Sequence, residues 1–181
     1  MLGLIVGKVA KDLLKDTIKK VRKKLKESGR GKFSAASEQN LKMAEEAGLP
    51  TELIDFYRSY EPYDPDGHGV YESEQHIHIW DIPNVLYTNR KTVPAFVVCP
   101  LGYYAIAETR CGDAYCMDSN VVGPEGHHPI VLFSHDSVDE DAELSYIQAS
   151  RLEVACSLED FLLKFASETL IDEPHYPPWP L

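Results

Sequence analysis

The sequence lacks a long apolar run. Nowhere in its 181 residues do about 18 consecutive apolar residues occur, the length that a membrane-spanning helix needs. Residues 1–16 place an apolar run first and lysines afterwards, whereas a secretory signal peptide has the opposite order. The sequence therefore predicts a cytoplasmic protein that does not span a membrane.

Cysteine is also scarce. The four cysteines are too few and too scattered for the disulfide framework of a small secreted domain, so we expect reduced thiols. They are Cys99, Cys111, Cys116 and Cys156. Cys99 directly precedes Pro100, and no neighbouring histidine or acid marks it as an activated nucleophile. We assign no catalytic residue and expect no enzymatic activity.

Motifs for metal and phosphate binding are incomplete. Cys111 and Cys116, separated by four residues, are followed by two histidines at 127–128, and zinc binds these residue types. Their spacing is longer than that of a zinc knuckle, and His76 and His78 fit exposed alternating positions of a strand. The glycines form no known phosphate-binding fingerprint. The sequence therefore predicts no metal ion and no cofactor, and a metal-dependent hydrolase is the third hypothesis for function.

Charge is plentiful but divided between two regions. The net charge is -11, yet residues 1–32 hold eleven Lys and Arg against three Asp and Glu, a net charge of +8. The other 149 residues hold seven basic and 26 acidic residues, a net charge of -19. Because an acidic body repels nucleic acid and attracts basic proteins, we expect a protein partner and no nucleic-acid ligand.

Helical patterns stand at both ends of the chain. Residues 2–27 have apolar residues at spacings of four and three, which predicts an amphipathic helix, and residues 28–32 form a basic linker. Ser37, Thr51 and Ser157 are each expected to cap a further helix.

Between these helices the apolar pattern changes to short runs typical of strands, after a loop expected over residues 61–69. Six strands are expected, over residues 76–80, 94–100, 103–109, 112–118, 128–135 and 147–155. Short connections between consecutive strands favour hairpins over parallel crossovers. The sequence thus predicts an α+β fold, a mainly antiparallel sheet of five or six strands with helices packed on one face and the other face free for binding.

The predicted elements divide the chain into three parts. We expect a basic amphipathic helix and linker over residues 1–32, one α+β domain over residues 33–171, and a Pro-rich tail over residues 172–181.

An ordered series of residues runs through the predicted domain. Its parts are Gly48-Leu49-Pro50, Leu53-Ile54-x-Phe56-Tyr57, Ala105 to Thr109, Gly112-Asp113-x-Tyr115-Cys116-x-Asp118, Pro129-Ile130-Val131, His135-Asp136, Ala149-Ser150 and Ser157-x-x-x-Phe161-Leu162. In order and type the series resembles the SUKH superfamily of Smi/Knr-like domains, over residues 37–170. The resemblance implies an α+β domain without known catalysis.

The resemblance also implies a function in protein binding. Many bacterial members bind and neutralise toxin domains, often nucleases. The first hypothesis is therefore an immunity protein of a toxin–antitoxin pair, with a basic toxin domain as its partner. Fungal relatives act as intracellular regulatory scaffolds, which is the second hypothesis.

Two stretches are candidates for the partner-binding site. Asp113, Tyr115 and Asp118 are expected to frame a concave site, although Asp113 can instead bond the backbone of its own turn. An acidic run in a loop between two predicted strands is expected to attract a basic partner. The residues of this run expected to contact the partner are Asp139, Glu140 and Asp141.

The basic helix over residues 2–27 leaves three interpretations open. It can pack back on the acidic body, lie on an anionic membrane surface, or bind a separate acidic partner. The first is favoured because the opposite charges are tethered within one chain, and contact with a membrane is less expected.

Overall fold

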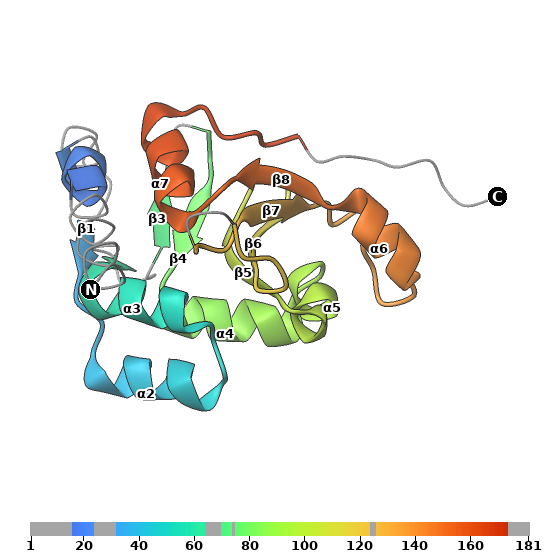
Figure 1. Cartoon of the computed structure of the whole chain (residues 1–181), viewed down its shortest axis with the longest axis horizontal. Helices are drawn as coiled ribbons and strands as arrows, with labels where there is room; N and C mark the ends of the chain where they lie inside the picture. The colour runs from blue at the N-terminus through green and yellow to red at the C-terminus, as the bar shows by residue number, and fades with distance from the viewer. Residues whose placement is uncertain (1–15, 24–31, 64–69, 74, 124–125, 174–181) are drawn as a thin grey trace.

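The computed structural model describes residues 16–23, 32–63, 70–73, 75–123 and 126–173, and these form an α+β fold (Figure 1). The strands are β1 (Lys32–Ser34), β2 (Glu61–Tyr63), β3 (Val70–Glu72), β4 (His78–Trp80), β5 (Tyr103–Glu108), β6 (Ala114–Asp118), β7 (Ile130–Phe133) and β8 (Leu152–Ala155). The helices are α2 (Glu38–Glu46), α3 (Thr51–Tyr60), α4 (Ile82–Lys91), α5 (Ala95–Val98), the 3-10 helix η1 (Cys99–Leu101), α6 (Leu144–Ser150) and α7 (Leu158–Ser167). None of the helices within the described ranges is long and apolar enough to cross a membrane.

One antiparallel sheet forms the centre of the fold. Its six strands run from β3 to β8, and each pairs with the next strand along the chain. β1 and β2 form a separate antiparallel pair. The expected α+β class and mainly antiparallel sheet are therefore confirmed, with β3 added before the first predicted strand.

Helix α4 was not predicted, although the sequence contains its cap. The Asp81 carboxylate accepts a 3.0 Å hydrogen bond from the Asn84 N–H, and Pro83 occupies the first turn, where no N–H is needed. The buried Asn89 side chain accepts from the Ala105 N–H at 2.9 Å and donates to the Ala105 carbonyl at 2.8 Å. These two bonds fix α4 on β5, where the register with β6 shifts.

One predicted strand is wrong, and another is confirmed only in its second half. Residues 94–100 form α5 and η1, because Pro94 and Pro100 have no N–H to donate to a ladder and a short apolar run also suits a buried helix. Residues 147–155 divide into the end of α6 and the strand β8.

The predicted helix caps are mostly confirmed. The hydroxyls of Ser37 and Ser157 each accept a 3.1 Å hydrogen bond from a backbone N–H three residues on. Thr51 is not a cap, because Pro50 holds that position and makes no side-chain bond. The predicted loop over residues 61–69 begins with strand β2.

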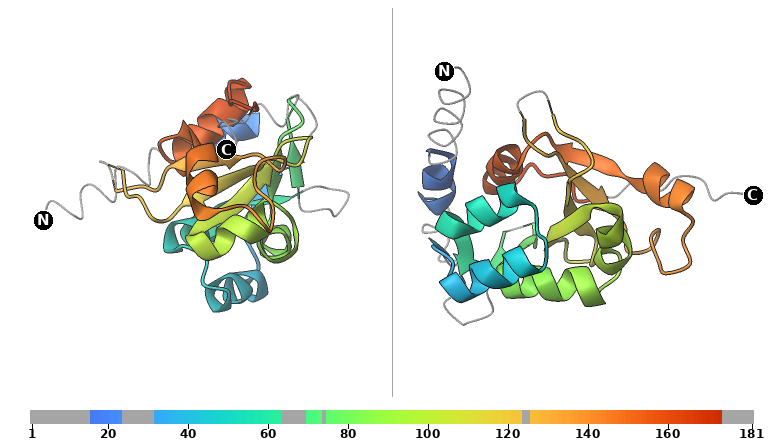
Figure 2. Two further views of the ribbon diagram at one scale, coloured as in Figure 1. Left: turned by 90° about the vertical axis from the view of Figure 1, so that its right-hand side faces the viewer. Right: turned by 60° about the horizontal axis from the view of Figure 1, so that its bottom comes forward.

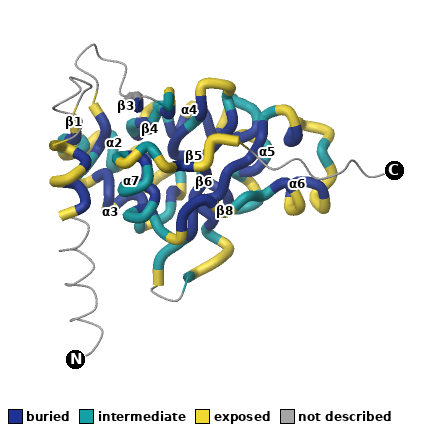
Figure 3. Tube along the Cα trace, turned by 90° about the horizontal axis from the view of Figure 1, so that it is seen from above, coloured by how far each residue is buried: buried dark blue, intermediate teal, exposed yellow. Residues whose placement is uncertain are grey.

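Both faces of the sheet are covered by helices. Alternate residues of a strand point to opposite faces, yet all five residues of β6 are buried. Tyr115 packs on Phe161 of α7 with ring centroids 5.3 Å apart, while α4 and α5 lie against the opposite face. Figure 3 shows the buried residues concentrated in the central strands. The expectation of one free face is therefore wrong, because α7 occupies it.

The helical residues 16–23 pack against the domain. Ile18 and Val21 are buried members of its core, and the Thr17 hydroxyl donates a 2.6 Å hydrogen bond to Glu159 of α7. This segment therefore packs back on the body of the domain, as the favoured interpretation expected, and buried apolar side chains are part of the contact. The rest of the predicted N-terminal helix and most of the linker and of the Pro-rich tail lie outside the described residues.

Candidate partner-binding surface

Asp113 lies buried in the turn between β5 and β6. Its carboxylate accepts hydrogen bonds from the Thr109 hydroxyl at 3.2 Å, from the His135 backbone N–H at 3.1 Å and from His135 Nδ1 at 2.7 Å. Gly112 before it has a φ of 94°, a left-handed conformation that glycine adopts without strain. Asp113 therefore connects this turn to the residues that follow β7. These bonds fit the alternative that Asp113 is a structural residue.

Tyr115 is completely buried in β6, against α7. Its hydroxyl donates a 2.9 Å hydrogen bond to the Ile171 carbonyl, and burial raises the pKa of this hydroxyl. The tyrosine therefore stays protonated and holds the segment that follows α7 against the sheet.

Asp118 at the end of β6 forms a buried ion pair. Its Oδ2 lies 3.1 Å from Arg151 Nε, off the direction of a hydrogen bond, while Oδ1 accepts from the Asn120 backbone N–H at 3.0 Å. Arg151 also lies 3.8 Å from the exposed Glu153. Because Arg151 stands between α6 and β8, Asp118 fixes that junction.

The three β6-region residues predicted to frame a binding site are thus buried within the domain. Asp113, Tyr115 and Asp118 are respectively 3%, 0% and 1% exposed. In this structure their side chains position the chain around the sheet, and their contact with a partner stays a prediction.

The acidic residues between β7 and α6 are placed very differently. We define the acidic segment as residues 135–144, which contain five carboxylates and no lysine or arginine. The predicted contact residues Asp139, Glu140 and Asp141 are all exposed in it. They remain candidates for contact with a partner.

The acidic segment has a defined conformation. Val138 is fully buried beneath it, and its N–H donates a 3.1 Å hydrogen bond to the Ser134 carbonyl. The Asp139 carboxylate accepts a 3.0 Å hydrogen bond from the Asp141 N–H. The Asp139 backbone carbonyl accepts a 3.2 Å hydrogen bond from the Ala142 N–H. With His135 held by Asp113, the segment is anchored at its start and at its middle.

A second exposed feature is the β6–β7 loop, residues 119–129. It exposes two adjacent apolar side chains, Val121 and Val122 (the valine pair), which are 41% and 63% exposed. Glu52 of α3 accepts hydrogen bonds from His127 Nδ1 at 2.9 Å and from the His128 N–H at 3.1 Å. One carboxylate thereby fixes the returning end of the loop.

The cysteines and histidines considered for a zinc site differ in burial or make other hydrogen bonds. Cys116 is buried in β6, where burial raises the pKa of its thiol, while Cys111 is exposed. His127 bonds Glu52, and His128 Nδ1 donates to the Val121 carbonyl at 2.8 Å. Within the ranges that the structure describes, no three His, Cys, Asp or Glu side chains group as a metal site.

Glu52 and the valine pair are not among the residues predicted from the sequence. Two valines directly before Gly123 in a turn-rich stretch are a local sign of exposed apolar residues. Glu52 has no such sign, because its partners lie on a loop distant in sequence and only the fold brings them together.

Residues 35–164 match the model of the SMI1 / KNR4 family (SUKH-1). The match covers more than two thirds of the chain and confirms the resemblance noted over residues 37–170. No curated protein matches the chain.

Proposed function

The chain belongs to the SMI1 / KNR4 family (SUKH-1), and on that basis we propose that it is a non-catalytic module that binds a basic partner protein through the acidic segment. The partner that we propose is a toxin domain with a basic surface, such as a nuclease, which the chain neutralises as an immunity protein.

The exposed and anchored acidic segment is the observation that supports this proposal. Its side chains Asp139, Glu140 and Asp141 face solvent, while Val138 and Asp113 hold the backbone beneath them. A segment that is ordered before binding loses less conformational entropy when a partner arrives. Its concentrated negative charge also accelerates encounter with a basic surface.

A nuclease is a suitable partner on chemical grounds. Proteins that bind nucleic acid present Lys and Arg to phosphate groups. A row of exposed carboxylates can pair with the same cations and so compete with the nucleic acid. The acidic body, with a net charge of -19 outside residues 1–32, adds to this attraction.

The second hypothesis, a regulatory scaffold, also requires a protein partner. The two differ in what binding does to that partner: an immunity protein abolishes a harmful activity, whereas a scaffold leaves its partner active or localises it. Growth of cells that contain the partner therefore discriminates between them.

The test begins with capture of partners by the full chain and identification of a basic protein. That protein is then expressed alone and together with the chain. We expect growth arrest when it is expressed alone, relief by the wild type, and weaker relief by the triple variant Asp139→Asn, Glu140→Gln, Asp141→Asn.

The matched control removes the same charge elsewhere. Glu38, Glu46 and Asp55 are exposed on α2 and α3, and these two helices lie away from α6 (Figure 1). The triple variant Glu38→Gln, Glu46→Gln, Asp55→Asn should protect as the wild type does. If both variants lose the same protection, the effect comes from net charge and not from the acidic segment. If the partner is harmless when expressed alone, the scaffold hypothesis is favoured.

A further inference from the structure

The β6–β7 loop is longer than a hairpin needs. Two to five residues are enough to join antiparallel strands, yet residues 119–129 separate β6 from β7. The valine pair on this loop is 41% and 63% exposed, and burying two such side chains would be favourable. The fold itself leaves them in solvent.

The valine pair is held in place by the loop's own hydrogen bonds. His128 Nδ1 donates to the Val121 carbonyl at 2.8 Å, and the Gly123 N–H donates to the His127 carbonyl at 2.8 Å. Glu52 of α3 accepts from both histidines and so fixes them to the body of the domain. The valines are therefore presented with little freedom to withdraw, a property of preorganised interface residues.

The loop and the acidic segment flank the same strand. β8 is an edge strand of the sheet, and in two views the described parts of the β6–β7 loop lie at one end of it while α6 and the acidic segment lie at the other (Figures 2 and 3). Glu153 on β8 and Leu144 at the start of α6 are also exposed. Exposed apolar and acidic groups thus lie at the two ends of β8.

We propose that the valine pair is the apolar anchor of the interface whose acidic flank is the acidic segment. The inference rests on the proposed function and deepens it: the partner presents Lys or Arg opposite Asp139, Glu140 and Asp141, and an apolar pocket opposite Val121 and Val122. Apolar side chains that a partner buries determine affinity more than peripheral charges, which mainly determine the rate of encounter.

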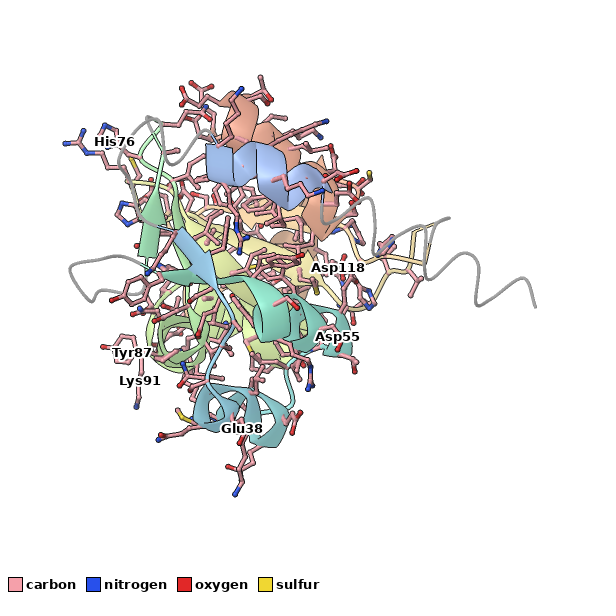
Figure 4. The ribbon with its side chains drawn as sticks, turned by 90° about the vertical axis from the view of Figure 1, so that its left-hand side faces the viewer. Glu38, Asp55, His76, Tyr87, Lys91 and Asp118 are labelled. Atoms are coloured by element: carbon pink, nitrogen blue, oxygen red, sulfur yellow. The ribbon has the colours of Figure 1, made fainter. Side chains whose placement is uncertain are left out.

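Site-specific photocrosslinking tests this inference. A benzophenone amino acid replaces Val122 in the full chain, and in a second protein it replaces Tyr87 on α4. Tyr87 is 64% exposed, similar to Val122, and it points to solvent on the side opposite Asp118 in Figure 4. The Val122 probe should crosslink the basic protein that the wild type captures, and the Tyr87 probe should not.

The outcomes separate this inference from the proposed function. If the basic protein is captured in a manner that depends on the acidic segment but does not crosslink from position 122, the anchor is wrong and the function stands. A crosslink from position 122 to a second copy of this chain would equally overturn the anchor. If no basic protein is captured at all, the proposed function is wrong, and the inference that rests on it is wrong as well.

Affinity provides the quantitative test. The double variant Val121→Ser, Val122→Ser should weaken binding of the identified partner about tenfold or more, mainly through faster dissociation. Tyr87→Ser should leave the affinity unchanged. Because all three side chains are exposed, the variants should keep the wild-type unfolding midpoint, and unchanged affinity of the double variant would contradict the anchor.

Discussion

The region around β6 and the surface that flanks β8 use the same residue types for opposite purposes. At β6 the carboxylates of Asp113 and Asp118 are buried. Asp113 accepts hydrogen bonds from His135, while Asp118 accepts one from Asn120 and forms an ion pair with Arg151. On the acidic segment, carboxylates of the same kind face solvent above a backbone that other groups hold. An acidic residue in this sequence can therefore hold the fold together or form the exposed surface, and its burial decides between the two.

The difference also shows how the two regions depend on each other. Asp113 bonds the first residue of the acidic segment, and Asp118 pairs with the arginine that follows α6. Changes at β6 should therefore reduce stability, whereas changes on the flanks should alter binding alone. The changes at Asp118, Asp113 and Glu52 test this division, and a change at Glu61 extends it to a buried carboxylate elsewhere in the fold.

The largest effect is expected for Asp118→Ala. The change leaves Arg151 without its buried counter-ion, and breaking such a pair costs about 3 kcal/mol of unfolding free energy. Urea unfolding measures the loss. Glu153→Ala removes a second carboxylate near Arg151, but an exposed one at 3.8 Å, and should cost less than about 0.5 kcal/mol. An equal loss of unfolding free energy in the two variants would contradict the distinction between structural and exposed carboxylates.

Asp113→Ala should reduce the free energy of unfolding by about 2 kcal/mol, because it removes charged hydrogen bonds to Thr109 and His135. The variant should also loosen the start of the acidic segment, which amide hydrogen exchange of His135 measures. A stable variant with unchanged exchange would show that Asp113 does not position the segment.

A smaller, local effect is expected for Glu52→Ala. Loss of its hydrogen bonds to His127 and His128 should cost about 1 kcal/mol and accelerate hydrogen exchange of the His128 amide. Asp55→Ala on the same helix changes an exposed carboxylate and serves as the control. If both variants exchange alike, Glu52 does not fix the loop.

The smallest effect concerns pH. Glu61 is buried, and burial raises its pKa, while its Oε1 accepts hydrogen bonds from Asn40 and from the Ile82 N–H. A carboxyl whose folded pKa is raised destabilises the fold in its ionised form, and this cost disappears as pH falls through the folded pKa. Glu61→Gln keeps an acceptor without the charge.

The Gln variant should therefore gain slightly in stability over the wild type at neutral pH, and this gain should vanish in acid. Thermal unfolding of both proteins across pH measures it. A gain that persists below the ordinary glutamate pKa would show that the charge of Glu61 is not its cause.

The comparison also explains what the sequence could and could not predict. Strands β5 to β7 were found because apolar runs bounded by turn residues suit a sheet. The run over residues 94–100 has the same appearance, yet its prolines belong to helices. Propensity alone does not separate a short buried strand from a short buried helix.

The burial of the candidate site residues could be foreseen only in part, for a related reason. The exposed position of Asp139, Glu140 and Asp141 follows from a run of charges, which rarely enters a core. Burial of Asp113 and Asp118 depends on partners at His135 and Arg151 that only the folded chain brings close. The sequence shows such residues without showing which way they face.

The central claim is that the exposed flank, and not the β6 carboxylates, governs encounter with the partner. The most direct test is the association rate constant of the basic partner at low and at physiological ionic strength. At low ionic strength the variant Asp139→Asn, Glu140→Gln, Asp141→Asn should associate about tenfold more slowly than the wild type, and this difference should shrink as salt screens the charges. The α2 and α3 control variant should stay within about twofold of the wild type. Equal association rates for the wild type and the flank variant at both ionic strengths would contradict the account.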